Sequence, residues 1–183
     1  ANNLLTLLQG YSKTIRLLLV MFLTLTVTTN AWGADVTISV SSDTWTNTGT
    51  SGSGGTTKVS KSGVTVSSDK GYKDGTTAIR EYSGGIITVS SSSNITKIVF
   101  TSTASGTNKY GPGKISLNSG GGEYSYSGTA GTWTGSSTSI KFECDAQFRW
   151  TQVVVTTAAS CTTPPTVSVG SHSNVTTTTA TVS

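Results

Sequence analysis

Residues that could perform acid–base chemistry are scarce in this chain of 183 residues. It contains eight Asp and Glu residues and one histidine, His172, near its C-terminal end. A Ser-His-Asp or Cys-His site needs an imidazole beside its nucleophile, so the domain that precedes His172 lacks the residue for such a site. A glycosidase pair needs two carboxyl groups about 5 to 9.5 Å apart, and no recognisable active-site motif surrounds the acids available for one, so we expect no catalysis. Those acids are Glu81, Glu123, Glu143 and Asp145.

Two other acids lie in the segment SSDKGYKDGTT, residues 67–77, which is predicted to form a turn-rich loop. The carboxylates of Asp69 and Asp74 could contribute oxygen ligands to a structural calcium ion. Their spacing lacks the alternating acids of an EF-hand, and Asp in a turn commonly caps its own backbone. Calcium at Asp69 and Asp74 is a candidate, and we expect no other cofactor.

The only two cysteines, Cys144 and Cys161, form a candidate disulfide if the chain is exported. Cys144 lies in an alternating strand-like run and Cys161 in a segment typical of a linker. Because their separation in space does not follow from the sequence, two unpaired thiols are the alternative. No spacing of these residues is typical of a zinc site.

Aromatic side chains are the stronger indication of binding. The apolar C–H faces of a sugar ring stack on Tyr or Trp, while polar neighbours bond to its hydroxyl groups. Arg149, beside Trp150, could donate to hydroxyls or stack on a ring. Burial in the core is the alternative for every aromatic, and three near loops, Tyr72, Tyr110 and Trp133, are expected to be exposed. The predicted ligand-binding set is Tyr72, Arg80, Tyr82, Tyr110 and Trp133.

The elements that position these side chains are predicted to be β-strands. Charged residues make up only 11% of the chain, with 21 Gly and 3 Pro, and short alternating apolar runs are separated by Gly, Ser and Asn clusters. About nine or ten strands with frequent breaks favour an all-β, antiparallel, jelly-roll-like β-sandwich. Residues 94–102 carry apolar side chains on both faces and predict a central strand, and Gly84-Gly85 predicts a hairpin between residues 77–82 and 86–90.

Residues 1–34 are predicted to be a secretory signal peptide with a few residues upstream of it. Lys13 and Arg16 precede an apolar run at residues 17–27, and small residues at 31–34 suit cleavage. A membrane-spanning helix is the competing interpretation, but the apolar run is shorter than the roughly 20 residues that it needs. We therefore expect a secreted or cell-surface protein, with membrane association only through export or downstream anchoring.

The charge of the chain argues against a nucleic-acid partner. The formal net charge of +4 falls to +2 on removal of Lys13 and Arg16, because ten of the 12 basic residues then remain with the 8 acidic residues. The remaining Lys residues are spread through turns and strand ends instead of forming a stripe. We expect a glycan or another cell-surface ligand as partner.

The composition divides the remainder into three parts. Residues 35–157 are predicted to form the sandwich, and residues 158–165 a linker that ends in Pro164-Pro165. Residues 166–183, with PPTVSV leading into them and NVTTTTATVS closing them, match the opening strands of a truncated domain of immunoglobulin-like or fibronectin type III-like kind. Two strands are too few to bury a core, so we expect the protein to continue beyond Ser183.

The succession AIREY, IITVSS, NITKIVFTS, YGPGKISL, YSYSG, GTWTG, SIKFE and FRWTQVVVT resembles a β-sandwich module of secreted multidomain surface proteins of Gram-negative gut bacteria. Such modules are similar to carbohydrate-binding or adhesive appendages and are often followed by immunoglobulin-like or fibronectin-like repeats. The resemblance implies a non-catalytic binding role and no established catalytic residues. A structural spacer in an adhesin and an accessory domain of a secreted hydrolase, its catalytic domain downstream, are the alternatives.

Overall fold

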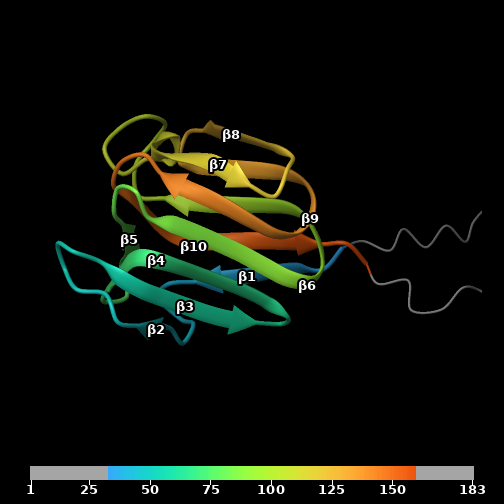
Figure 1. Cartoon of the computed structure of the whole chain (residues 1–183), viewed down its shortest axis with the longest axis horizontal. Helices are drawn as coiled ribbons and strands as arrows, with labels where there is room; N and C mark the ends of the chain where they lie inside the picture. The colour runs from blue at the N-terminus through green and yellow to red at the C-terminus, as the bar shows by residue number, and fades with distance from the viewer. Residues whose placement is uncertain (1–32, 160–183) are drawn as a thin grey trace, which may run out of the picture.

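The computed structural model describes residues 33–159, which are nearly all β and antiparallel, as predicted (Figure 1). The predicted signal peptide, linker and second domain fall outside these residues except at their borders. Among the described residues the strands are interrupted by a 3-10 turn, η2 (Pro112–Lys114). The strands are β1 (Asp35–Ser39), β2 (Thr46–Asn47), β3 (Gly55–Lys61), β4 (Val64–Asp74), β5 (Ala78–Glu81), β6 (Ile86–Ser102), β7 (Ile115–Ser119), β8 (Glu123–Ser127), β9 (Ala130–Cys144) and β10 (Phe148–Thr157).

The two longest strands, β6 and β9, pair with each other and belong to both layers of the sandwich. The first part of β6 pairs with β4, where Val66 lies opposite Val89. Its second part pairs with β10, where Val99 lies opposite Val154. A short strand, β5, then joins β4 to β10, so the hydrogen-bonded sheet folds around a common interior.

The interior is built from alternating side chains of these strands. Phe100 of β6 contacts the rings of Phe142, Phe148 and Trp150 edge-on, with centroids 5.4 to 5.9 Å apart. The prediction of a central strand at residues 94–102 is confirmed, since this part of β6 has β9 on one side and β10 on the other. Burial of these aromatic rings, together with the Val and Ile side chains around them, stabilises the fold.

Two local predictions are wrong. Residues 67–77 are not a loop, because β4 continues to Asp74 and only residues 75–77 turn. Gly84-Gly85 does turn the chain, but β5 and β6 do not pair there, since β5 pairs with β4 and β10 instead. Turn residues report where the chain reverses and not which strand becomes the partner.

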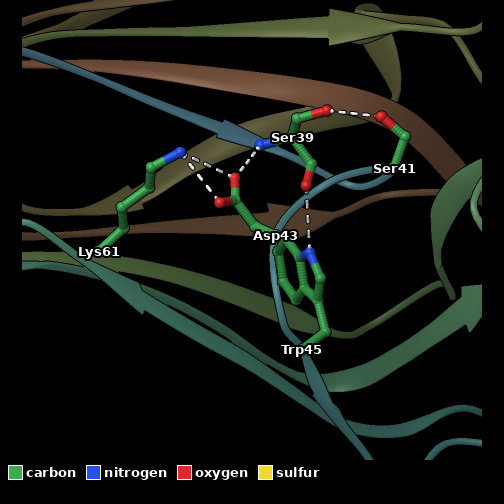
Figure 2. A network of polar contacts seen from close by, with 5 residues as sticks. All are labelled: Ser39, Ser41, Asp43, Trp45 and Lys61. Carbon is green, nitrogen blue, oxygen red and sulfur yellow. Dashed lines mark hydrogen bonds and ion pairs between the residues drawn. The ribbon is translucent and has the colours of Figure 1, made fainter.

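A polar network fastens the segment between β1 and β2 to the sheet (Figure 2). One carboxylate oxygen of Asp43 accepts the backbone N–H of Ser39 at 2.7 Å, and Lys61 of β3 donates to the carboxylate at 2.9 Å. Trp45 donates from Nε1 to the Ser39 carbonyl at 3.4 Å and packs its ring against Trp150 at 5.5 Å. The backbone bond from Ser39, aided by Lys61, lowers the pKa of Asp43.

Replacing Asp43 with alanine is expected to lower the free energy of unfolding by about 1 kcal/mol at pH 7. Because the folded-state pKa is lowered, the contribution is complete above pH 3.8 and is lost as the pH falls through the folded-state pKa. Urea unfolding at pH 7 and pH 2 measures the difference. Lys61→Ala, which removes only a half-exposed partner, is the control and should cost less. An equal loss at both pH values would contradict the assignment.

The chain enters and leaves the sandwich at the same end. The N–H of Thr157, the last residue of β10, donates to the Ala34 carbonyl just before β1 at 3.1 Å. From there β10 runs back to Phe148 at the other end, where β5 lies (Figure 1). Within residues 33–159, no helix is long and apolar enough to cross a bilayer.

Candidate functional site

Four side chains from four neighbouring segments share the outer face of the sheet at the end where β5 lies. Tyr72 of β4 is opposite Arg80 of β5, and Arg80 is opposite Arg149 of β10. Tyr110, in the loop between β6 and η2, is bridged in parallel to Phe148 and stacks on Arg149. We call Tyr72, Arg80, Arg149 and Tyr110 the tip row. It lies eight residues of β10, about 26 Å, from Thr157.

The contact between Arg149 and Tyr110 is the closest in the row. The guanidinium carbon lies 3.6 Å from the ring centroid, and the backbone N–H of Arg149 donates to the Tyr110 carbonyl at 3.2 Å. Arg149 Nε is buried without an acceptor among residues 33–159, and one Nη donates to Gln147 Oε1 at 3.3 Å. The guanidinium thus lies over the ring at cation–π distance.

Tyr110 has a backbone conformation that a bulky residue rarely adopts. Its φ is 77°, in the left-handed region that favours glycine. Such a conformation costs about 1 to 2 kcal/mol for a residue with a Cβ. The fold therefore holds a tyrosine in a backbone conformation that glycine would adopt at lower cost.

The other half of the row is formed by Arg80. Its Nε donates to Asp74 Oδ2 at 2.9 Å and a second guanidinium nitrogen donates to the same oxygen. The guanidinium carbon lies 5.8 Å from the centroid of the Tyr72 ring. Arg80 therefore leans toward β4, whereas Arg149 leans the other way, onto Tyr110.

Lys109 adds a third cation beside the row. Its Nζ lies 5.1 Å from the centroid of the Tyr110 ring. A hydrogen bond from the Lys109 ammonium, with the charges of Arg149 and Arg80, lowers the pKa of the Tyr110 hydroxyl. The positive field at this end of the domain therefore acts on a half-buried phenol that can donate or accept a hydrogen bond.

Tyr82 flanks the row and has a structural partner. It follows Arg80 by two residues and so points to the same face. Its hydroxyl accepts the backbone N–H of Gly52 at 2.7 Å, which fastens the loop at residues 48–54 beside β4. Tyr82 thus shapes one side of the site through this loop.

The structure brings together four of the five predicted binding residues, namely Tyr72, Arg80, Tyr82 and Tyr110. The expectation that Trp133 is exposed is wrong: its ring is fully buried in the core and its Nε1 donates to the Gly121 carbonyl at 2.7 Å. The sequence reasoning also missed Lys109 and Gln147, which carry no pattern of their own. Arg149 stacks on Tyr110 and not on its chain neighbour Trp150, which points inward.

A buried carboxyl group lies on the opposite face of β5. Glu81 is fully buried, and accepts hydrogen bonds from Ser68 Oγ and, at 3.2 Å, from Trp150 Nε1. Burial raises the pKa of Glu81 to about 7. Gly71 leaves room for it, since a Cβ there would lie 2.5 Å from Thr57 Oγ1 and 3.1 Å from Glu81 Oε2. Glu81 is a core group and is separated from the tip row by the strand itself.

The remaining candidate acids are spread over the surface. Asp145 lies 3.3 Å from Ser116 Oγ and Glu143 3.3 Å from Asn118 Nδ2, and Glu123 is exposed on β8. These contacts do not arrange two carboxylates around a cleft. An open groove of about 340 Å³ does lie on the outer face over β3, β4, β6 and β9, lined by Thr56, Ser67, Ser68, Asp69, Ile86, Thr88 and Lys141.

The two predicted calcium ligands have protein partners. Asp69 accepts the backbone N–H of Ile86 at 2.7 Å, and Asp74 accepts from Arg80. No group of three or more His, Cys, Asp or Glu residues that could hold a metal ion occurs within residues 33–159. The thiol of Cys144 is buried in the core, which raises its pKa, and Cys161 lies outside the described residues.

Comparison with known protein families, curated proteins and solved structures found no match. What the site can bind is therefore inferred from its own residues. Two aromatic faces, two planar guanidinium groups and one amide side chain lie together on an accessible sheet surface. Such a surface suits binding by stacking and hydrogen bonding.

Proposed function

We propose that residues 33–159 form a secreted or cell-surface, non-catalytic binding module for carbohydrate or an adhesive surface ligand, within a larger multidomain protein. The observation that carries the proposal is the tip row, in which Tyr72, Arg80, Arg149 and Tyr110 line up across four adjacent segments. The row matches a sugar chemically. Tyrosine faces stack on C–H surfaces, and guanidinium and phenol groups bond to hydroxyls.

The length of the row favours an extended ligand. Adjacent strands lie about 4.8 Å apart, so the three steps from Tyr72 to Tyr110 span about 14 Å. Each tyrosine is half-buried and braced by an arginine, so its ring is already oriented before a ligand arrives. Such preorganisation reduces the entropy cost of binding. We therefore propose an oligosaccharide, in preference to a single sugar, as the ligand.

The strained backbone at Tyr110 supports a binding role. A bulky residue with φ of 77° persists only where the surroundings hold it, and such residues cluster at functional sites. The buried Nε of Arg149, which has no acceptor among residues 33–159, is a second local cost of the same contact. Neither cost is needed to build the sandwich, whose core lies on the other face of the strands.

The position of the tip row also suits binding. The chain continues beyond Thr157, at one end of β10, whereas the tip row lies at the other end of that strand, where β5 pairs with it. The row is therefore at the end of the domain away from residue 157, where β5 lies (Figure 1). This arrangement presents the row to a ligand on another surface.

The proposal predicts binding on a glycan array that depends on the rings of the tip row. Tyr110→Ala and Tyr72→Ala are each expected to weaken binding about tenfold or more, the value of one lost stacking contact of about 1.4 kcal/mol. Tyr110→Phe keeps the ring and should retain most of the binding. Lys97→Ala is the distant control, because Lys97 is an exposed residue of β6 that lies opposite Thr156.

The test separates the proposal from a spacer role. If the chain binds no glycan on the array, or if both tyrosine variants bind as well as the unaltered chain, the proposed site is wrong. Thermal unfolding of each variant, followed by circular dichroism, excludes misfolding as the cause of a loss.

A further inference from the structure

We propose that the tip row selects acidic glycans, whose carboxylate or sulfate groups bind at Arg149, the cross-strand neighbour of Arg80. The inference rests on the proposed binding function and narrows it to a ligand class. It follows from two properties of the row: its charge balance and the pairing of Arg80 with Arg149 across β5 and β10.

Positive charge in and beside the row exceeds negative charge. Arg80, Arg149 and Lys109 lie in or next to it, and Asp74 is the one carboxylate that pairs with any of them within residues 33–159. Asp74 neutralises Arg80 alone. Arg149 has the neutral Gln147 as its side-chain acceptor. The row thus carries an uncompensated charge in a protein whose charged residues are few.

The two arginines are direct cross-strand neighbours. Arg80 is opposite Arg149 in the antiparallel pairing of β5 and β10, so their Cβ atoms lie about 5 Å apart on one face. Like charges in this position repel and destabilise the pair of strands. An anion bound at Arg149 offsets this repulsion, since guanidinium groups bind carboxylate and sulfate through paired N–H donors.

The contact between Asp74 and Arg80 is an example of a carboxylate bound by an arginine of the row. It accepts two guanidinium nitrogens of Arg80 on one oxygen, which is a charge-assisted contact of the kind that a uronic acid could make. Arg149 presents the same planar group over the Tyr110 ring, and no acid among residues 33–159 forms an ion pair with it. An acidic sugar that stacks on Tyr110 would place its anionic group beside Arg149.

The test compares four oligomers of similar length by isothermal titration with the whole chain: an oligogalacturonate, a sulfated galactan, a neutral galactan and a single-stranded DNA. At low salt we expect at least one acidic glycan to bind about tenfold or more tightly than the neutral one. Raising the salt concentration should weaken this preference, because the site is open to solvent. The uronate and sulfate arms tell the two anions apart.

Variants make the test specific to the row. Arg149→Gln should remove the preference for the acidic glycan. Lys97→Gln is the matched control, because it removes one positive charge from β6 opposite Thr156, at the other end of β10, and it should leave the preference unchanged. Asp74→Asn should tighten binding of the acidic glycan several-fold, because it frees Arg80. A purely structural role for Asp74 would instead weaken binding.

The outcomes are distinguishable. Equal or tighter binding of the neutral galactan overturns the acidic preference and leaves the proposed function standing. Binding of DNA as tight as that of the best acidic glycan overturns it too, because charge alone then explains the affinity. Binding of none of the glycans, here and on the array, overturns the inference and the proposed function together.

Discussion

Replacing Trp150 with alanine is expected to lower the free energy of unfolding by about 4 kcal/mol, the largest effect of any single change considered for this domain. Trp150 is fully buried and contacts the rings of Phe100 and Trp45, both at 5.5 Å between centroids. Its removal leaves a cavity in the middle of the sandwich. It also removes the Nε1–H that donates to Glu81.

Urea unfolding followed by circular dichroism measures this loss. Trp150→Phe keeps a ring in the core but removes the donor to Glu81 and the part of the indole that a phenyl ring does not fill. We expect it to cost about 1 to 3 kcal/mol. Trp45→Ala, at a partly buried tryptophan that packs against the same core, is the matched control and should cost less than Trp150→Ala. A cost below that of the control would show that Trp150 does not hold the core together.

Replacing Glu81 with glutamine is expected to make the domain more stable at pH 8 and to flatten its stability between pH 4.5 and 7. In the wild type the pKa of Glu81 is about 7 when folded and near its ordinary 4.5 when unfolded. Between these values the unfolded chain binds fewer protons than the folded one, so rising pH favours unfolding. The contribution of Glu81 to the free energy of unfolding is constant below pH 4.5 and above pH 7. Between these values the free energy of unfolding falls by about 3 kcal/mol as the pH rises.

Unfolding free energies at pH 4.5, 6 and 8 test this sign. The glutamine variant lacks the dependence because it cannot ionise, and its side-chain oxygen still accepts from Trp150 or Ser68. Glu123→Gln, at an exposed carboxylate on β8, should follow the wild type at every pH. The prediction would be contradicted if the stability of the wild type rose from pH 4.5 to 8 and Glu81→Gln showed the same rise.

Much of the fold could be predicted because alternation of side chains is local. The runs at residues 94–102 and 148–156 show it directly, and both became central strands. Strand pairing is not local. The turn at Gly84-Gly85 predicted a hairpin, yet β5 pairs with β10, a strand that lies some seventy residues further along the chain.

The candidate site could be predicted only in part for the same reason. Tyr72, Arg80 and Tyr110 were candidates from their residue types, but their alignment with Arg149 depends on the register of two strand pairs and on one isolated bridge. Trp133 was misplaced because GTWTG has the composition of a turn, whereas β9 runs through it and directs the ring inward.

The burial of Glu81 was not predicted either. Acidic side chains are exposed in most proteins, and nothing in the run AIRE distinguishes Glu81 from a surface acid. Its partners, Ser68 and Trp150, come from strands that are remote in sequence. A buried acid of this kind becomes visible only when the strands around it are placed.

The central claim is that the tip row is the binding surface, and NMR titration of the chain with the tightest glycan from the array tests it most directly. The amide resonances of Tyr72, Arg80, Tyr110 and Arg149 should shift together, while those of Ala34 and Thr157 at the attachment end stay in place. Shifts confined to the groove around Thr88 and Lys141, with the tip row unchanged, would contradict the account.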